Sequence, residues 1–134
     1  MQRQMLKSKI HRATVTGCDV DYIGSVTVDT DLLEQADILP NELVHVWDIT
    51  NGARMVTYAL AGEPGSGTVQ INGAAALLAN VGDRVIVATY ANYDESEIAT
   101  YAPVVVHVDD DNRAVAVDSR PEVLLAGAGP GAEI

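Results

Sequence analysis

Short segments in which apolar and polar residues alternate make up most of the chain, and turn-forming residues separate them. An apolar period of two is typical of a strand with one buried face. The pattern predicts strands at residues 5–16, 25–29, 43–49, 54–61, 68–71, 84–90, 104–108 and 114–117. Thr30 or Asp31 ahead of Leu32 and Leu33 predicts a short capped helix that ends before Pro40, and residues 73–79 a second one. We therefore expect a mainly β chain.

Turns and a weak internal repeat indicate how these strands are connected. Asn51-Gly52 predicts a two-residue hairpin with positive φ at both positions, and residues 109–112 predict another turn. Placing Glu42 over Asp83 aligns a short helix and the following strand in one half with the same pair in the other. Two such units suggest a closed barrel with a pseudo-twofold axis, which leaves no exposed sheet edges. From Arg120 onward Gly, Ala and Pro dominate, so residues 118–134 are expected to form a flexible tail.

Composition narrows the classes of protein that fit this pattern. The formal net charge is −11, with 8 Lys and Arg against 19 Asp and Glu. Nucleic acid and anionic membranes reward clustered cations, so neither is expected as a partner. Half of the cations nevertheless lie in the first twelve residues, at Arg3, Lys7, Lys9 and Arg12.

Cysteine and histidine usage bears on compartment and metal binding. Cys18 is the only cysteine, which rules out an intrachain disulfide and a Cys-rich metal site and fits a reducing compartment. His45 and His107 lack metal-ligand spacing, so we expect no metal. The N-terminus has no apolar secretory region, and no apolar stretch is long enough for a membrane helix, so we expect a cytoplasmic protein.

Two strands carry polar residues that could form a site. Lys9 and His11 share one face of the first strand, although Lys on a strand commonly serves as an exposed edge that blocks aggregation. Arg54 and Tyr58 share one face of a later strand, and Thr57 points to the other. Such residues are often solvated or packed at a rim, so spacing alone assigns them no role.

Glycine-rich stretches carry alternative interpretations. Residues 62–67 lack the Lys-Ser/Thr ending of a phosphate loop and predict a turn. Asn72-Gly73-Ala74-Ala75 begins a helix, where backbone N–H groups can hold an anion, or is simply a turn into that helix. Gly24-Ser25 is either a bend or a site of chemistry. Glycine can adopt angles that bring the next serine hydroxyl against the preceding carbonyl, as an N-to-O acyl shift requires.

Five motifs, taken together and in this order, resemble the pyruvoyl-dependent aspartate 1-decarboxylases. They are KSKIHR at residues 7–12, DYIGS at 21–25, NGARMVTYA at 51–59, GSGTVQINGAAA at 65–76 and VGDRVIV at 81–87. Departures are Pro64, where that family often has a basic residue, Leu77, where it often has His, and the tail from Asp118. The resemblance implies a six-stranded double-psi β barrel with short helices, formed by residues 1–117 and assembled as a homotetramer with active sites between subunits.

The resemblance also implies a proenzyme that cuts itself between Gly24 and Ser25 into residues 1–24 and 25–134. Ser25 Oγ attacks the Gly24 carbonyl, and the resulting ester is converted into a pyruvoyl group at position 25. This group serves as the electron sink for decarboxylation of L-aspartate to β-alanine, the precursor of pantothenate and coenzyme A. No metal is implied. A pyridoxal phosphate enzyme needs a Schiff-base lysine and normally a longer chain, whereas only Lys7 and Lys9 are present here.

Roles of individual residues follow from the matched motifs. The resemblance makes Ser25 and Tyr58 catalytic, with Tyr58 as the proton donor to the carbanion carbon. Self-processing involves Gly24, Ser25 and Thr57, with Tyr22 and His11 as lesser contributors; Trp47 is a lesser contributor to the site. The substrate-binding set is Lys9, Arg54, Thr57, Asn72, Gly73, Ala74 and Ala75.

Two alternatives stay open on sequence grounds. One is a pyruvoyl decarboxylase of another amino acid, although two cations, Lys9 and Arg54, favour a substrate with two carboxylates. The other is a non-catalytic β-barrel binding module with a basic N-terminal arm, in which Gly24-Ser25 is an ordinary bend. Whether maturation is autonomous or needs a helper protein is also open.

Overall fold

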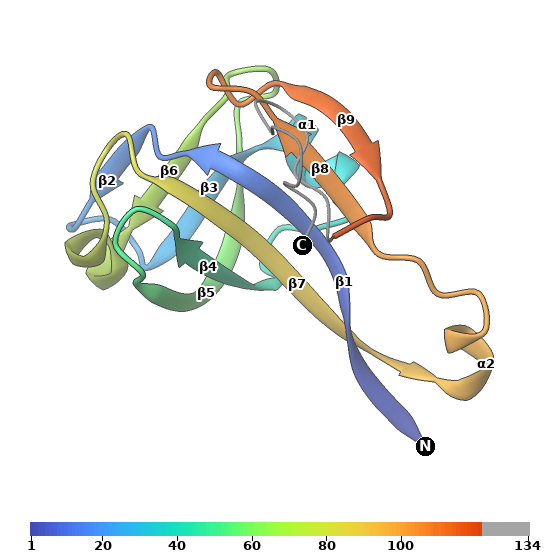
Figure 1. The fold of residues 1–134 in the computed structure, drawn as a ribbon. Helices are drawn as coiled ribbons and strands as arrows, with labels where there is room; N and C mark the ends of the chain where they lie inside the picture. The colour runs from blue at the N-terminus through green and yellow to red at the C-terminus, as the bar shows by residue number, and fades with distance from the viewer. Residues whose placement is uncertain (122–134) are drawn as a thin grey trace.

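The computed structural model describes residues 1–121, and strands dominate it (Figure 1). The elements in chain order are β1 (Gln2–Thr14), β2 (Gly17–Asp19), β3 (Ser25–Asp29), α1 (Thr30–Gln35), β4 (Leu43–Asp48), β5 (Arg54–Gly62), β6 (Val69–Asn72), the 3₁₀ helix η1 (Gly73–Leu78), β7 (Arg84–Asp94), α2 (Glu95–Ile98), β8 (Val104–Val108) and β9 (Ala114–Asp118). The prediction of a mainly β chain with short helices is confirmed.

All nine described strands are connected by hydrogen bonds in the order β2-β6-β3-β5-β4-β7-β1-β8-β9. The segment β1–β2 binds this array at two places, because β1 pairs with β7 and β8 while β2 pairs with β6. Only two residues separate β1 from β2. The strands β2 and β6, which begin the strand order, therefore lie close to the end of β1. The sheet therefore curls around one core, and the paired ribbon of β1 and β7 extends away from it toward the N-terminus and α2 (Figure 1).

The weak internal repeat corresponds to a local symmetry of the sheet. Strands β4 and β7 pair antiparallel, and Val46 pairs with Val87. Val46 and Val87 are also equivalent residues when Glu42 is placed over Asp83. Equivalent residues that pair with each other lie on a pseudo-twofold axis, so the two halves meet at this pair, as the repeat predicts.

Aliphatic side chains from both halves fill the core. Val26 and Val28 of β3, Val46 of β4 and Val87 of β7 are fully buried, together with Ile10 of β1. The chain contains no Phe, so many β-branched residues build the interior. These residues suit strands because their branched side chains pack well on a pleated surface. The burial alternates along β4, which leaves its other face for His45 and Trp47.

Several local predictions need correction. The Asn51-Gly52 turn is not a two-residue hairpin, because β4 ends at Asp48, β5 begins at Arg54, and Gly52 has positive φ whereas Asn51 does not. The Asp48 carboxylate accepts the backbone N–H groups of Thr50 and Asn51, which stabilises this longer loop. The sequence pattern also missed β2, α2 and the last four residues of β7.

The C-terminal region is described as far as residue 121. Asp118 ends β9, and Lys9 Nζ donates a hydrogen bond of 3.0 Å to the Pro121 carbonyl. The remainder of the expected tail, residues 122–134, lies outside the described residues. Within residues 1–121, no helix is both long and apolar enough to cross a membrane.

Candidate active site

Ser25 lies where an exposed loop enters the barrel. Tyr22 and Ile23 are 48% and 66% exposed, whereas Ser25, the first residue of β3, is fully buried. Ser25 Oγ donates a hydrogen bond of 2.8 Å to the Ile23 carbonyl and accepts one of 3.0 Å from Asn72 Nδ2. The hydroxyl is thus fixed beside the peptide bond that joins Gly24 to Ser25.

Asn72 holds Ser25 from β6. The two residues pair in the antiparallel ladder of β3 and β6, and Asn72 Nδ2 lies 3.0 Å from both Ser25 Oγ and Thr27 Oγ1. The Asn72 side-chain oxygen accepts from Gln70 Nε2, which fixes the amide orientation. Asn72 precedes η1 but makes no side-chain cap bond to that helix. Its amide is therefore directed to β3.

Tyr58 lies on the opposite flank of Ser25. The parallel ladder of β3 and β5 begins with Val26 beside Ala59, so Ser25 and Tyr58 directly precede the first pair. Along β5, Arg54, Val56 and Tyr58 are more exposed than Met55 and Ala59, which are buried. Arg54 and Tyr58 therefore share the outer face and Thr57 faces inward, as the strand periodicity predicts.

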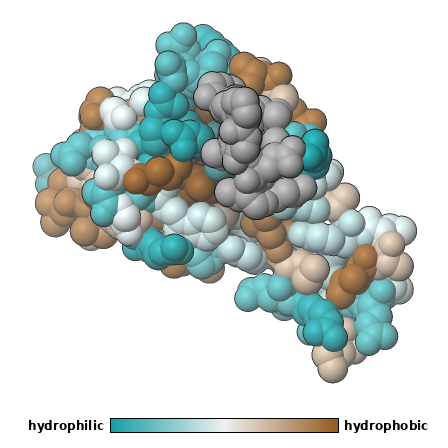
Figure 2. All heavy atoms as spheres, in the orientation of Figure 1, coloured by the Kyte–Doolittle hydropathy of each residue, from teal (hydrophilic) through white to brown (hydrophobic). Residues whose placement is uncertain are grey.

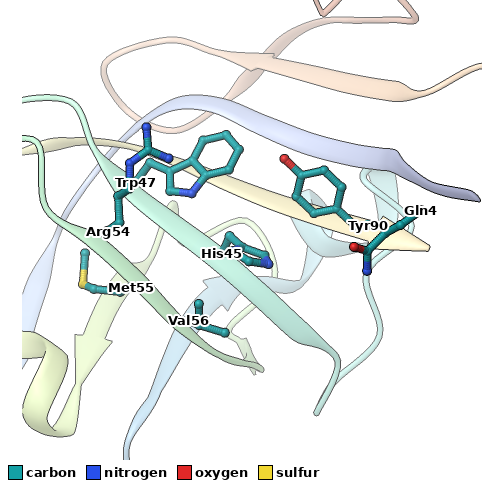
Figure 3. A pocket seen from close by; sticks show the side chains of 7 residues that line it. All are labelled: Gln4, His45, Trp47, Arg54, Met55, Val56 and Tyr90. Carbon is teal, nitrogen blue, oxygen red and sulfur yellow. The ribbon is translucent and has the colours of Figure 1, made fainter. Parts of the chain in front are cut away.

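Arg54 lines a pocket on the outer face of the sheet (Figure 3). Its guanidinium carbon lies 5.5 Å from the centre of the Trp47 ring, within the range of a cation–π contact. The His45 ring makes an edge contact with Tyr90 at 5.4 Å between centroids. The cavity measures about 470 Å³ and is lined by Gln4, His45, Trp47, Arg54, Met55, Val56 and Tyr90. No acid is among these residues, so the pocket favours an anion at Arg54.

Lys9 and His11 form a third group, next to residues 118–121 at the end of the described chain. They are 8% and 7% exposed. Strand β1 lies between β7 and β8, so the interpretation of these residues as an exposed basic edge is wrong. His11 pairs with His107 of β8, and their rings meet edge to face at 5.8 Å. His107 Nε2 in turn lies 3.1 Å from Asp118 Oδ2.

The environment of His11 keeps this imidazole neutral. Burial, followed by the charges of Lys9, His107 and Arg12, lowers the pKa of His11 from 6.5 to about 4. Neither ring nitrogen of His11 has a hydrogen-bond partner among the described residues, although both are buried. Buried polar groups are normally satisfied, so this imidazole can take a further partner.

Within one chain, the Ser25 and Tyr58 pair, the Arg54 pocket and the Lys9 and His11 pair lie apart from one another. Lys9, Ala88, His45 and Val56 form one row across β1, β7, β4 and β5. Three strand spacings of about 4.8 Å therefore separate Lys9 from Val56, roughly 14 Å in all. Arg54 is four residues from Tyr58, or about 13 Å along β5 at about 3.3 Å per residue. Lys9 and Arg54 thus lie on one face of the sheet but do not meet in one pocket with Tyr58.

Comparison with known proteins identifies a matching family model and several similar proteins. A family model described as aspartate decarboxylase matches residues 1–115. The chain belongs to the aspartate decarboxylase family. It is 61% identical over 115 residues to the aspartate 1-decarboxylase of Myxococcus xanthus, covering 86% of this chain and 88% of the relative.

Two further members of the aspartate decarboxylase family support the assignment. The aspartate 1-decarboxylase of Mycolicibacterium smegmatis is 53% identical over 128 residues, which cover 96% of this chain and 94% of the relative. The aspartate 1-decarboxylase of Syntrophotalea carbinolica is 55% identical over 112 residues, which cover 84% of this chain and 86% of the relative. The family predicted from the five motifs is confirmed. The fold agrees with the double-psi β barrel of this family, and the described residues form nine strands in all, one more than the eight that the sequence pattern predicted.

The sequence pattern gave no role to several residues that lie around the site of this aspartate decarboxylase family member. Gln4, His45 and Tyr90 line the Arg54 pocket, and His107 and Asp118 lie beside His11. Strand alternation places His45 and Trp47 on one face, which was a usable signal. The pairing of His11 with His107 joins residues far apart in the sequence, so local pattern contained no signal for it.

Proposed function

We propose that this chain decarboxylates L-aspartate to β-alanine and carbon dioxide, the step that supplies β-alanine for pantothenate and coenzyme A. Family membership supports the reaction. The observation that carries the proposal in this chain is the buried Ser25 hydroxyl, held by Asn72 at the end of an exposed loop. A cytoplasmic location fits a biosynthetic enzyme of this kind.

The first step is self-cleavage at Gly24-Ser25. Ser25 Oγ forms a bond to the Gly24 carbonyl carbon, the bond from that carbon to the Ser25 nitrogen breaks, and the hydroxyl proton passes to the nitrogen. Elimination from the resulting ester releases Gly24 as a carboxylate, and hydrolysis releases ammonia and leaves a ketone at position 25. The hydrogen bonds of Ser25 to Ile23 and Asn72 keep the hydroxyl at this junction.

The surroundings of Ser25 fit a pyruvoyl group. Asn72 Nδ2 donates to Ser25 Oγ in the uncleaved chain, and after that oxygen has left with Gly24 the amide is available to donate to a carbonyl oxygen of residue 25. Ser25 itself is fully buried in the uncleaved chain, and the loop that precedes it is exposed. When present, the pyruvoyl group supplies an electron sink for the carboxylate's departure. No metal and no pyridoxal phosphate are part of this proposal.

The chain's own residues bind and protonate the substrate. Arg54 grips one aspartate carboxylate, and its planar guanidinium suits a bidentate contact. Lys9 contributes a second cation, and Tyr58, which flanks Ser25, donates the proton to carbon. The lining of the substrate site comes from Thr57, Asn72, Gly73, Ala74 and Ala75. His11, Tyr22 and Trp47 have supporting roles, and Thr57 also acts in self-processing.

The distances favour a site shared between subunits. Aspartate is much shorter than the ~13 Å that separate Arg54 from Tyr58 along β5. An Arg54 from a neighbouring chain removes this difficulty, so we propose a homotetramer with active sites between subunits. Ile23 in the cleavage loop and Leu77 in η1 are exposed, and apolar surface gathers at the end of the molecule that carries β2 and η1 (Figure 2), which supports an interface there. A helper protein for maturation is a further partner that the family allows.

Formation of β-alanine tests the proposal. Purified protein is incubated with L-aspartate, and β-alanine and carbon dioxide are measured. The native chain is expected to form both in equal amounts, whereas Ser25→Ala forms neither. Ser96→Ala, which removes an exposed hydroxyl on α2, is the matched control and should keep full activity.

Three outcomes would redirect the assignment. Turnover of another amino acid in place of aspartate identifies the alternative pyruvoyl decarboxylase. A chain that stays whole and inactive, even with cell extract added to supply a helper, favours the non-catalytic binding module. Activity that survives Ser25→Ala excludes a group derived from Ser25.

A further inference from the structure

Gly73 makes the closest backbone approach to the cleavage loop. It begins η1, is buried and has φ of +74°. A Cβ on Gly73 would lie 2.5 Å from Gly24 Cα, 2.9 Å from Gly24 N and 3.3 Å from the Tyr22 carbonyl oxygen. Carbon atoms in contact are normally about 3.5–4.0 Å apart. The loop before Ser25 therefore packs directly against the backbone of residue 73.

This contact constrains Gly24 from one side. A Cβ built on Gly24 would meet no atom within 4 Å, and Gly24 does not have a positive φ. The tight packing at this junction is thus a property of Gly73. Glycine is needed there for two reasons, the left-handed backbone and the absence of a side chain.

Asn72 and Gly73 together hold both ends of one peptide bond. Asn72 fixes Ser25 through the strand pairing and its side-chain amide, and Gly73 supports Gly24. We propose that Gly73 is a positioning residue for self-cleavage, setting the Gly24 carbonyl where Ser25 Oγ attacks it. This inference rests on the proposed function, since it concerns the maturation of the same site, and it adds a role that substrate binding does not include.

The proposal predicts how a side chain at residue 73 acts. Relieving a contact of 2.5 Å requires a displacement of Gly24 by about 1 Å. A misplacement of about 1 Å between reacting groups can cost on the order of 100-fold in rate. The shift of the acyl group from nitrogen to Ser25 Oγ should slow by that factor, although residue 73 exchanges no proton or electron with the reacting atoms.

Cleavage kinetics of matched glycine variants test the proposal. Gly73→Ala and Gly73→Asn both add a Cβ, and Asn tolerates positive φ better than Ala. Gly82→Ala is the control, because Gly82 also has positive φ, +95°, but a Cβ there meets nothing within 4 Å. Intact mass spectrometry over time should show cleavage roughly 100-fold slower in both Gly73 variants and unchanged in Gly82→Ala.

A second measurement separates folding from positioning. Each variant is also made with Ser25→Ala, which prevents cleavage, and its thermal unfolding is followed. We expect both Gly73→Ala and Gly82→Ala to fold, with the larger loss of stability in Gly73→Ala, because only its Cβ meets the Gly24 backbone. Hydroxylamine, which cuts an ester at residue 25, should at early times cut the Gly73 variants far less than the native chain, because their ester forms much more slowly.

Each remaining outcome has a definite meaning. Cleavage of Gly73→Ala within a few-fold of the native rate overturns the positioning role, and so does an equal loss of rate in Gly82→Ala. Failure of both Gly73 variants to fold in the Ser25→Ala background makes residue 73 a folding requirement and also overturns it. If the native chain itself is never cleaved, the proposed function fails instead.

Discussion

Ser25 is held between two strands whose flanking residues have different expected roles. Asn72 on β6 binds its hydroxyl, and Tyr58 on β5 lies at the other side of the same residue. Asn72 contacts the hydroxyl in the uncleaved chain, whereas no hydrogen bond joins Tyr58 to it among the described residues. Loss of the Tyr58 hydroxyl should therefore affect turnover and leave cleavage intact.

Tyr58→Phe separates these two steps. The variant keeps the ring and loses only the hydroxyl, so self-cleavage should proceed normally. Turnover should fall by about 100-fold or more, the usual contribution of a positioned general acid. Tyr93→Phe, which removes a hydroxyl on the distal part of β7, is the control. Full β-alanine production by Tyr58→Phe contradicts the assigned role.

Trp47 supports the guanidinium of Arg54. A cation–π contact at an exposed site contributes about 0.5–1 kcal/mol, so Trp47→Leu should raise KM for aspartate about 2–5-fold with little change in kcat. Trp47→Tyr keeps an aromatic face and should lose less. Since Trp47 is the only tryptophan, its fluorescence should change on aspartate binding. An unchanged KM in Trp47→Leu contradicts this support.

At the residue scale, sequence alone predicted which face a side chain occupies but not how deeply it is buried. Alternation correctly placed Arg54 and Tyr58 together and Thr57 opposite. Lys9 and His11 share a face as predicted, yet their burial depends on β8 and on residues 118–121, which are distant in sequence. The close packing of Gly73 against Gly24 is likewise a long-range contact without a local signal.

At the scale of elements, the loop between β4 and β5 depends on a pair of buried acids. Asp48 Oδ1 accepts two loop N–H groups, while Asp48 Oδ2 is buried without a hydrogen-bond partner among the described residues. Burial and a side-chain interaction with Asp83 raise the pKa of Asp48. An acid with a raised folded pKa favours folding when protonated, so its contribution is present at low pH and is lost as pH rises through the folded pKa.

Asp48→Asn tests this arrangement. Asparagine keeps an oxygen for the two loop N–H groups and offers Nδ2 to Asp83. The variant should be more stable than the native chain at neutral pH, and the difference should shrink as pH falls and Asp48 becomes protonated. Asp111→Asn, an exposed change of equal charge, is the control. Thermal unfolding between pH 4 and pH 8 measures the effect; a difference that is independent of pH contradicts it.

The elements that could be predicted are those whose own apolar and β-branched residues form a recognisable pattern. β3 and β8 occupy the predicted residues because each is a short β-branched run between turn signals. β2 has three residues and depends on pairing with β6, so its pattern is too short to detect. α2 was missed although Asp94 and Glu97 form a capping box, a signal that the sequence does contain.

At the scale of the whole molecule, a net charge of −11 should repel an anionic substrate. Attraction must then be local, and the Arg54 pocket has no acid in its lining. The backbone positions of Arg54 and Tyr58 lie ~13 Å apart along β5, which is longer than aspartate and supports the proposal that the two residues acting on one substrate come from different chains.

Co-expression of two inactive variants tests this shared site. Ser25→Ala cannot generate the reactive group, and Arg54→Ala lacks the carboxylate contact, so each alone should be inactive. Mixed assemblies contain sites that combine the intact Ser25 of one chain with the intact Arg54 of the other, and activity should partly return. Mixed assemblies that remain as inactive as the parents contradict a site between subunits.

We expect Ser25 to become the reactive group of this chain. The most direct measurement is the intact mass of the purified protein. We expect two polypeptides, residues 1–24 and residues 25–134, the second carrying a ketone in place of an amino group at position 25. A single chain of full length that nevertheless forms β-alanine from L-aspartate would contradict it.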